Sequence, residues 1–140
     1  EARDTAVREI CVRYGVDLIV LAGYLGILTD PLLDWYAGKI INIHPALLPK
    51  FGGKGMYGLN VHKAVIEAGE TVSGATVHYS VKEIDAGAII LQRSLDVLPD
   101  DTPESLQKRI LEQIEHPLLV EAVAMLCAQE DEPVVEEDEE

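Results

Sequence analysis

The sequence is poor in positive charge and in cysteine, and each shortage excludes a class of protein. Only 11 of the 140 residues are Lys or Arg, against 25 Asp or Glu, and the formal net charge is −14. Nucleic-acid binding is therefore disfavoured, because no basic stripe is present to neutralise phosphates. The two cysteines, Cys11 and Cys127, lie far apart in segments of helical pattern. We expect free, buried thiols of a reducing compartment rather than a disulfide or a metal pair.

Long apolar runs are also missing. No segment approaches the roughly 20 apolar residues that span a bilayer, and residues 1–14 are too charged for a signal peptide. A hydrophobic content of 48% with 26% charged residues is typical of a globular protein, and 140 residues is the usual size of one domain. We therefore expect a cytoplasmic protein that binds neither a membrane nor nucleic acid, while the sequence leaves open whether it is a monomer or homodimer.

Acidic residues are concentrated at one end of the chain. Residues 130–140, EDEPVVEEDEE, carry eight acidic residues and no basic one. Such a segment repels itself and has little apolar surface to bury, which predicts a disordered, solubilising tail. Binding of a basic partner is the alternative role for this tail. The domain itself is expected to cover residues 1–129.

The rest of the chain alternates helical patterns with short apolar strands. The first two strands are almost continuous apolar runs, as is typical of strands buried on both faces, and the helix between them completes a βαβ unit. The pattern predicts an α/β fold with a Rossmann-like open sheet, mostly parallel with an antiparallel hairpin and flanked by helices. Helices are expected at 2–14, 30–36, 59–68 and 102–129, with an interruption at Pro117, and strands at 16–22, 39–43, 71–81 and 88–97.

The second strand runs into the segment IINIHPALLPK, which carries the most informative polar residues. Asn42 and His44 are two residues apart, so their side chains share one face of an extended strand. The carboxamide donates hydrogen bonds, and the imidazole titrates near neutral pH. This pair suits a reaction that builds negative charge on a carbonyl oxygen. The loop that follows, residues 45–58, is long for a compact domain, and loops of that length are often functional.

A third polar residue is expected beside this pair. Ligands of open α/β sheets bind beyond the carboxyl ends of the strands, and Asp85 lies in the loop between the last two strands. An aspartate there would hold the imidazole of His44 and raise its pKa. The alternative is a structural histidine and an ordinary turn aspartate. His78 either faces the same cleft or has a structural role, which we favour, and the histidine spacings predict no metal site.

The segments INIHPALLPKFGGKGMYG and SGATVHYSVKEIDAGAIILQ resemble the phosphoribosylglycinamide formyltransferases of purine biosynthesis. They are a branch of the folate-dependent formyltransferase family, which also includes formyltetrahydrofolate deformylases and methionyl-tRNA formyltransferases. The similarity covers residues 1–128. It implies an enzyme that transfers the formyl group of 10-formyltetrahydrofolate, its co-substrate, to the amine of glycinamide ribonucleotide. The alternatives are a deformylase that hydrolyses the same folate and a folate-binding fragment without turnover.

The resemblance also implies roles for individual residues. Asn42, His44 and Asp85 match the catalytic trio of the family. Pro45 and Glu115 match residues that contact the glycinamide substrate, and the Leu48–Pro49 bond matches a cis bond in relatives. The implied folate site consists of Leu25, Gly26, Ile27 and Leu28 after the first strand, Asn42, and the closing segment Val81, Lys82, Glu83, Ile84 and Asp85.

The sequence departs from the family pattern in two places. Relatives begin with a strand and a glycine-rich phosphate loop, and this sequence contains neither. We therefore expect a chain that lacks the N-terminal third, with weakened binding of the nucleotide phosphate. Relatives also often carry Tyr-Pro shortly after Glu-His, where Pro117 and Leu118 follow in this chain, which leaves the path of the last helix open.

Overall fold

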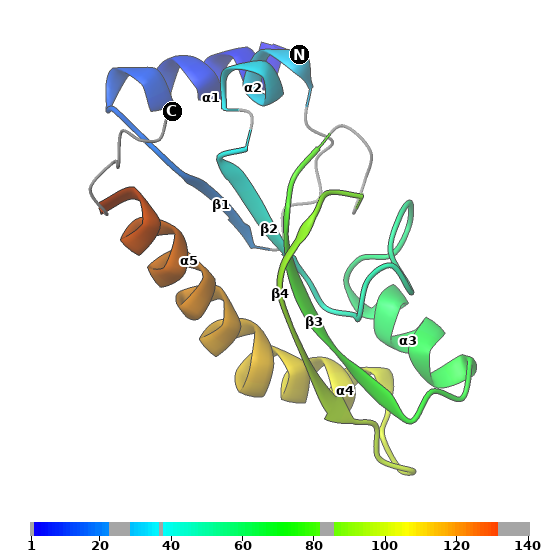
Figure 1. Ribbon diagram of the computed structural model, residues 1–140. Coiled ribbons are helices and arrows are strands. Elements are labelled where there is room, and N and C mark those ends of the chain that lie inside the picture. The colour runs from blue at the N-terminus through cyan, green and yellow to red at the C-terminus, as the bar shows by residue number, and fades with distance from the viewer. Residues whose placement is uncertain (1, 23–28, 37, 82–85, 132–140) are drawn as a thin grey trace.

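The structure, a computed structural model, describes residues 2–22, 29–36, 38–81 and 86–131 (Figure 1). Every helix and strand expected from the sequence is found in it, with ends shifted by a few residues. In chain order the elements are α1 (Ala2–Arg13), β1 (Ile19–Ala22), α2 (Asp30–Trp35), β2 (Ile40–His44), α3 (Leu59–Glu67), β3 (Val72–Tyr79), β4 (Ile89–Asp96), α4 (Pro103–Ile110), the π-helical turn η1 (Leu111–Glu115) and α5 (His116–Asp131).

The four strands form one open sheet in the order β1-β2-β3-β4 (Figure 1). The α/β class and the antiparallel hairpin of β3 and β4 are confirmed. The expected predominance of parallel pairing is not found among the described strands, because only β1 and β2 are parallel and β2 and β3 are antiparallel. After β2 the chain passes through a loop and then α3, which bring it back to the end of the sheet at which β2 stops. His44, the last residue of β2, lies opposite Thr76 in the middle of β3.

The alternation of side chains along β2 separates the core from the polar face. Ile41 and Ile43 belong to a buried cluster with Ile110, Ile114 and Leu118 of the α4–η1–α5 segment. Because successive side chains of a strand point to opposite faces, Asn42 and His44 lie on the other face of the sheet. The sheet thus presents an apolar face to these helices and a polar patch on the opposite side.

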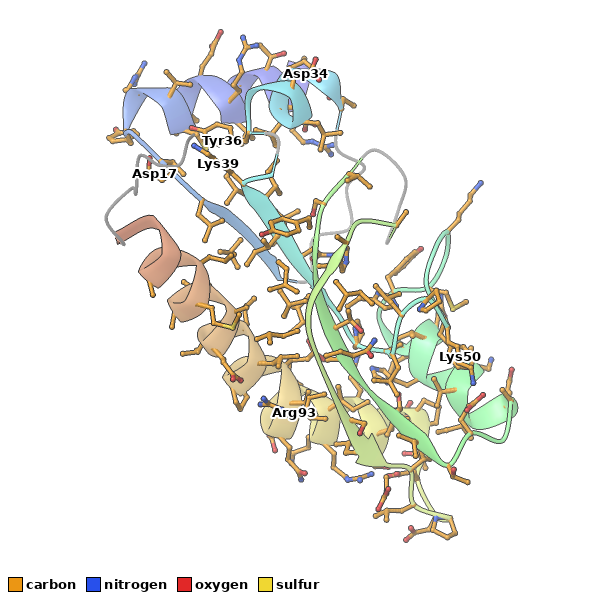
Figure 2. The ribbon with its side chains drawn as sticks, viewed as in Figure 1. Asp17, Asp34, Tyr36, Lys39, Lys50 and Arg93 are labelled. Atoms are coloured by element: carbon orange, nitrogen blue, oxygen red, sulfur yellow. The ribbon has the colours of Figure 1, made fainter. Side chains whose placement is uncertain are left out.

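A second, smaller cluster joins the first two helices to the start of β2. Leu32 and Tyr36 of the α2 segment pack with Ile40, and Val7 of α1 covers them. Figure 2 shows Tyr36 between the layer of α1 and α2 and the sheet. Burial raises the pKa of its phenol. This cluster fixes the edge of the sheet at which β1 and β2 begin.

The long C-terminal helix begins as the sequence predicts. The Thr102 hydroxyl accepts from the backbone N–H of Ser105, the Ser105 hydroxyl accepts from the backbone N–H of Thr102, and Pro103 occupies the first turn. The interruption expected at Pro117 takes the form of η1, which ends two residues before it. Proline lacks the backbone N–H and its ring crowds the carbonyl one turn earlier, and the wider π turn accommodates both.

Beyond η1, α5 continues along the sheet. Arg93 of β4 contacts Glu121 of α5 at 2.8 Å (Figure 2). The helix runs to Asp131, two residues past the expected domain end at 129, and residues 132–140 of the predicted tail lie outside the described residues. None of the described helices is long and apolar enough to cross a bilayer.

Both cysteines are free thiols, as expected. Cys127 is exposed, however, and not buried. It follows the buried Leu118 by nine positions, which at 3.6 residues per turn places it on the opposite side of α5. Cys11 lies half-buried on α1.

Candidate active site

Asn42 and His44 occupy the positions that the sequence predicts for them. They lie on the polar face of β2, and β1 and β3 pair with this strand on its two sides. His44 is buried, with only 4% of its surface exposed, and Asn42 is half-buried. Side chains held on a central strand keep a more fixed position than side chains on loops.

The imidazole of His44 is oriented by a backbone carbonyl. Its Nε2 lies 2.7 Å from the carbonyl oxygen of Phe51. A carbonyl only accepts hydrogen bonds, so Nε2 carries the proton and donates. In the neutral ring Nδ1 is then the nitrogen that can take up a proton. Phe51 itself has a φ of 58°, a conformation seldom adopted by bulky residues and often found at functional sites.

His78 lies directly opposite Asn42 and contacts it. The Nδ1 of His78 is 3.0 Å from the carbonyl oxygen of Tyr79, so it donates there. In the neutral ring Nε2 is an acceptor, and it lies 3.5 Å from the Nδ2 of Asn42. This contact turns the amide nitrogen of Asn42 toward His78. His78 therefore has the structural hydrogen bond that we favoured and also touches a residue of the site.

His62 is a further buried imidazole, to which the sequence assigned no role. It is 1% exposed and lies on α3. Burial and the neighbouring His44 lower its pKa to about 4, so it is neutral at pH 7. A neutral His62 adds no positive charge that would oppose protonation of His44. The burial of His62 follows from the packing of α3 and has no local sequence signal.

Glu115, the expected substrate residue, has unusual titration behaviour. It lies half-buried in η1, and burial raises its pKa to about 7. A π turn inside a helix is frequent at functional sites. The turn η1, which carries Glu115, packs against β3, the strand of His78. Pro45 directly follows His44 and is half-buried.

Other expected site residues lie outside the described part of the chain. Val81 is described and is 41% exposed. The strand-end argument for Asp85 does not apply, because β3 runs antiparallel to β2 and its end lies beside the start of β2, where the N–H of Ser80 donates to the carbonyl of Ile40. The role of Asp85 thus depends on the resemblance. The undescribed site residues are Leu25, Gly26, Ile27, Leu28, Lys82, Glu83, Ile84 and Asp85.

The chain is similar to proteins of one family along most of its length. The family model described as "Formyl transferase" matches residues 1–123. The chloroplastic phosphoribosylglycinamide formyltransferase of Arabidopsis thaliana is 49% identical over 119 residues, which are 85% of this chain and 40% of that protein. The phosphoribosylglycinamide formyltransferase of Haemophilus influenzae is 46% identical over 110 residues, 79% of this chain and 50% of that protein.

Solved structures of a formyltransferase and of a deformylase are also similar to this chain. The phosphoribosylglycinamide formyltransferase of Anaplasma phagocytophilum has a TM-score of 0.81 at 37% identity, over 94% of this chain and 61% of that chain. A formyltetrahydrofolate deformylase of Pseudomonas syringae has a TM-score of 0.76 at 32% identity, over 88% of this chain and 39% of that chain. The chain spans at most half the length of the two curated relatives named above. With its polar strand end and its mixed open sheet, this chain belongs to the formyl transferase family.

Proposed function

We propose that the protein transfers the formyl group of 10-formyltetrahydrofolate to the amine of glycinamide ribonucleotide, as a step of purine biosynthesis. The observation that carries this proposal is the pair of Asn42 and His44, side by side on one face at the end of β2. A hydrogen-bond donor beside a titratable imidazole suits acyl transfer through a charged intermediate. The names of relatives that are 46% and 49% identical support the formyl group and the acceptor.

The first step is attack of the free amine on the formyl carbon. A C–N bond forms, and the carbonyl π pair moves onto the oxygen to give a tetrahedral oxyanion. Asn42 donates an amide N–H to that oxygen, and the orientation of its amide is set by His78. Fixed donors aimed at the developing charge stabilise the transition state, because they need no reorganisation during the reaction.

The second step moves a proton and releases the folate. With Nε2 of His44 donating to Phe51, Nδ1 is the nitrogen that exchanges a proton with the reacting atoms. The amine loses a proton, N10 of the folate gains one, and the C–N10 bond breaks to release tetrahydrofolate. We propose that Asp85 stabilises the charged form of His44. These two reaction steps need neither a metal ion nor a covalent enzyme intermediate.

We propose two binding regions around this centre. The folate ring occupies the region of Leu25–Leu28 and Val81–Asp85, and Asn42 borders it. The glycinamide substrate lies beside Pro45 and Glu115. Glu115, with a pKa of about 7, carries a partial negative charge at neutral pH that attracts an ammonium group.

Product analysis tests this function and separates it from the runner-up. The protein is incubated with 10-formyltetrahydrofolate, with and without glycinamide ribonucleotide, and formylated ribonucleotide and formate are quantified. The proposal predicts formylated ribonucleotide whenever the acceptor is present. Formate released at the same rate without the acceptor would instead identify a deformylase, which the likeness to the Pseudomonas syringae enzyme makes the second candidate. Folate binding without formation of either product would indicate a folate-binding protein without turnover.

The domain boundary and the place of action are further proposals. We propose that residues 1–129 form the folded unit and that residues 130–140 contribute little to its stability. Deletion of residues 130–140 should change the free energy of unfolding by less than about 0.5 kcal/mol, as surface changes usually do. We propose a cytoplasmic location, and since the Arabidopsis thaliana relative is named chloroplastic, a fluorescent fusion should be examined for plastid import as well.

A further inference from the structure

We propose that Thr76 and Gln92 are positioning residues that set the orientation of His44 by holding the loop that follows it. These two side chains come from β3 and β4, and they bind the backbone of residues 46–48. The effect of this clamp on turnover rests on the proposed function, while its effect on the His44 ring does not.

The hydroxyl of Thr76 uses every hydrogen bond that it can make. It donates to the carbonyl oxygen of Ala46 at 2.7 Å and accepts from the backbone N–H of Leu48 at 3.1 Å. It also accepts from the side-chain amide of Gln92 at 2.9 Å. A hydroxyl has one donor and two acceptor sites, so all three are occupied. Thr76 is fully buried, and a buried hydroxyl with all its hydrogen bonds made favours one arrangement of its partners.

Gln92 makes a further hydrogen bond to the same stretch of backbone. Its Nε2 donates to the carbonyl oxygen of Leu48 at 3.0 Å, in addition to the bond with Thr76. The N–H and the carbonyl of Leu48 are thus both held by side chains of the sheet. This residue precedes Pro49, which has no backbone N–H to contribute, so the side chains of Thr76 and Gln92 take the place of a regular backbone ladder.

The loop lies directly against β3 at the same point. A Cβ atom built on Gly74 would come within 2.0 Å of the Arg93 carbonyl oxygen of β4 and within 2.8 Å of a methyl group of Leu47, so the Leu47 side chain lies close against β3 at this glycine. Farther along, Lys50 and Glu70 form an exposed ion pair at 3.3 Å (Figure 2), which contributes little because solvent screens it. The hydrogen bonds of the buried Thr76, together with those of the exposed Gln92, therefore determine the course of this part of the loop.

The held stretch lies between His44 and the group that orients it. His44 is two residues before Ala46, and Phe51, whose carbonyl receives the His44 Nε2–H, is three residues after Leu48. A shift of residues 46–48 would move Phe51 and weaken the hydrogen bond between its carbonyl oxygen and the His44 ring. The ring would then populate both tautomers, and Nδ1 would no longer be the constant proton-exchanging atom.

Four variants test the clamp. Thr76→Val keeps the volume and removes all three hydrogen bonds, whereas Thr76→Ser keeps the hydroxyl. Gln92→Met removes only the amide and is the milder change, in case Thr76→Val does not fold. Ser73→Ala is the matched control, because Ser73 lies buried on the same strand and its hydroxyl has no partner among the described atoms.

Two readouts are measured on each variant. The first is the ¹⁵N chemical shift of both His44 ring nitrogens in the ligand-free protein, at a pH where the ring is neutral. We expect a single Nε2–H tautomer in the parent, Thr76→Ser and Ser73→Ala, and tautomer averaging in Thr76→Val and, more weakly, Gln92→Met. The second is formyl transfer, where kcat should fall about 10- to 100-fold in Thr76→Val with KM for the folate little changed, since small displacements of catalytic groups have effects of that size.

The two readouts keep this inference and the proposed function apart. An unchanged His44 tautomer in a folded Thr76→Val or Gln92→Met protein overturns the clamp, whatever the activity. Equal perturbation by Ser73→Ala also overturns it, because the effect would then be general to β3. Tautomer averaging in Thr76→Val, together with no formyl transfer even by the parent protein, would uphold the clamp and refute the proposed function.

Discussion

The Nε2 of His44 and the carbonyl oxygen of Phe51 are 2.7 Å apart and join the end of β2 to the middle of the loop that follows it. This hydrogen bond assigns the proton to Nε2. It also places the two ends of residues 44–51 against each other, so the conformation of the loop and the state of the imidazole are linked. The first prediction concerns this imidazole.

Replacement of His44 by Asn should lower kcat for formyl transfer by about 100- to 10,000-fold, the usual contribution of a general acid or base. Asparagine keeps a polar side chain but cannot exchange a proton. Binding of a non-reactive folate analogue, measured by calorimetry, should stay close to that of the parent. A variant with the same kcat as the parent would show that His44 takes no part in the chemistry.

Replacement of Asp85 by Asn should lower formyl transfer by orders of magnitude while folate binding remains. The reason is that the amide cannot stabilise a protonated His44 as a carboxylate does. Rates are compared with those of Asp100→Asn, an acidic residue in the turn after β4. Equal rates in the parent and in Asp85→Asn would show that His44 works without it.

Replacement of Glu115 by Gln should stabilise the protein at alkaline pH. Burial raises the pKa of Glu115 from 4.5 to about 7, so its carboxyl favours folding at low pH and this contribution is lost as the pH rises through 7. At pH 8.5 the variant should gain up to about 3 kcal/mol, since each pKa unit corresponds to 1.36 kcal/mol. Urea unfolding at pH 5 and pH 8.5 measures the difference.

Glu112→Gln is the control for this experiment, because Glu112 belongs to the same π turn and is exposed. It should change stability equally little at both pH values. A Glu115→Gln variant with no pH-dependent gain would mean that Glu115 titrates like a solvated carboxyl. If Glu115 contacts the acceptor, the same substitution should also raise KM for glycinamide ribonucleotide.

Replacement of His62 by Gln should reduce the acid sensitivity of the fold. The pKa of His62 is lowered from 6.5 to about 4, so the unfolded chain binds a proton that the folded chain does not. Its stabilising contribution is complete above pH 6.5 and is lost as the pH falls toward 4. The fall in unfolding free energy over this range should be about 3 kcal/mol smaller in the variant.

Denaturant unfolding at pH 7 and pH 4.5 tests the role of His62 independently of any overall loss of stability. His116→Gln, at an exposed position of α5, is the matched control and should leave the pH dependence unchanged. The same acid sensitivity in the parent and in His62→Gln would contradict a buried, neutral imidazole.

Features that depend on local spacing were predictable from the sequence. The two-residue spacing of Asn42 and His44 was enough to place them on one face of β2, because strand alternation is a property of the backbone. The cap at Thr102 was equally local, since its partner Ser105 is three residues away. The interruption of the last helix followed from Pro117, although its π form did not.

Features that depend on contacts between distant segments were not predictable. Thr76 and Gln92 resemble ordinary strand residues, and their partners are 28 and 44 residues away in the chain. The direction of β3 was also missed, because a strand–helix–strand pattern is the same whether the helix crosses the sheet or remains at one end of it. The raised pKa of Glu115 arises from burial in the folded protein and leaves no mark on the residues beside it.

A crystal structure with a bound, non-reactive analogue of 10-formyltetrahydrofolate tests the central claim most directly. The account predicts that the oxygen standing in for the formyl oxygen lies within about 3.2 Å of the Asn42 amide nitrogen or of the His44 ring. The analogue should lie on the polar face of β2, opposite Ile41 and Ile43. A folate bound with its formyl mimic out of reach of both side chains would contradict the account.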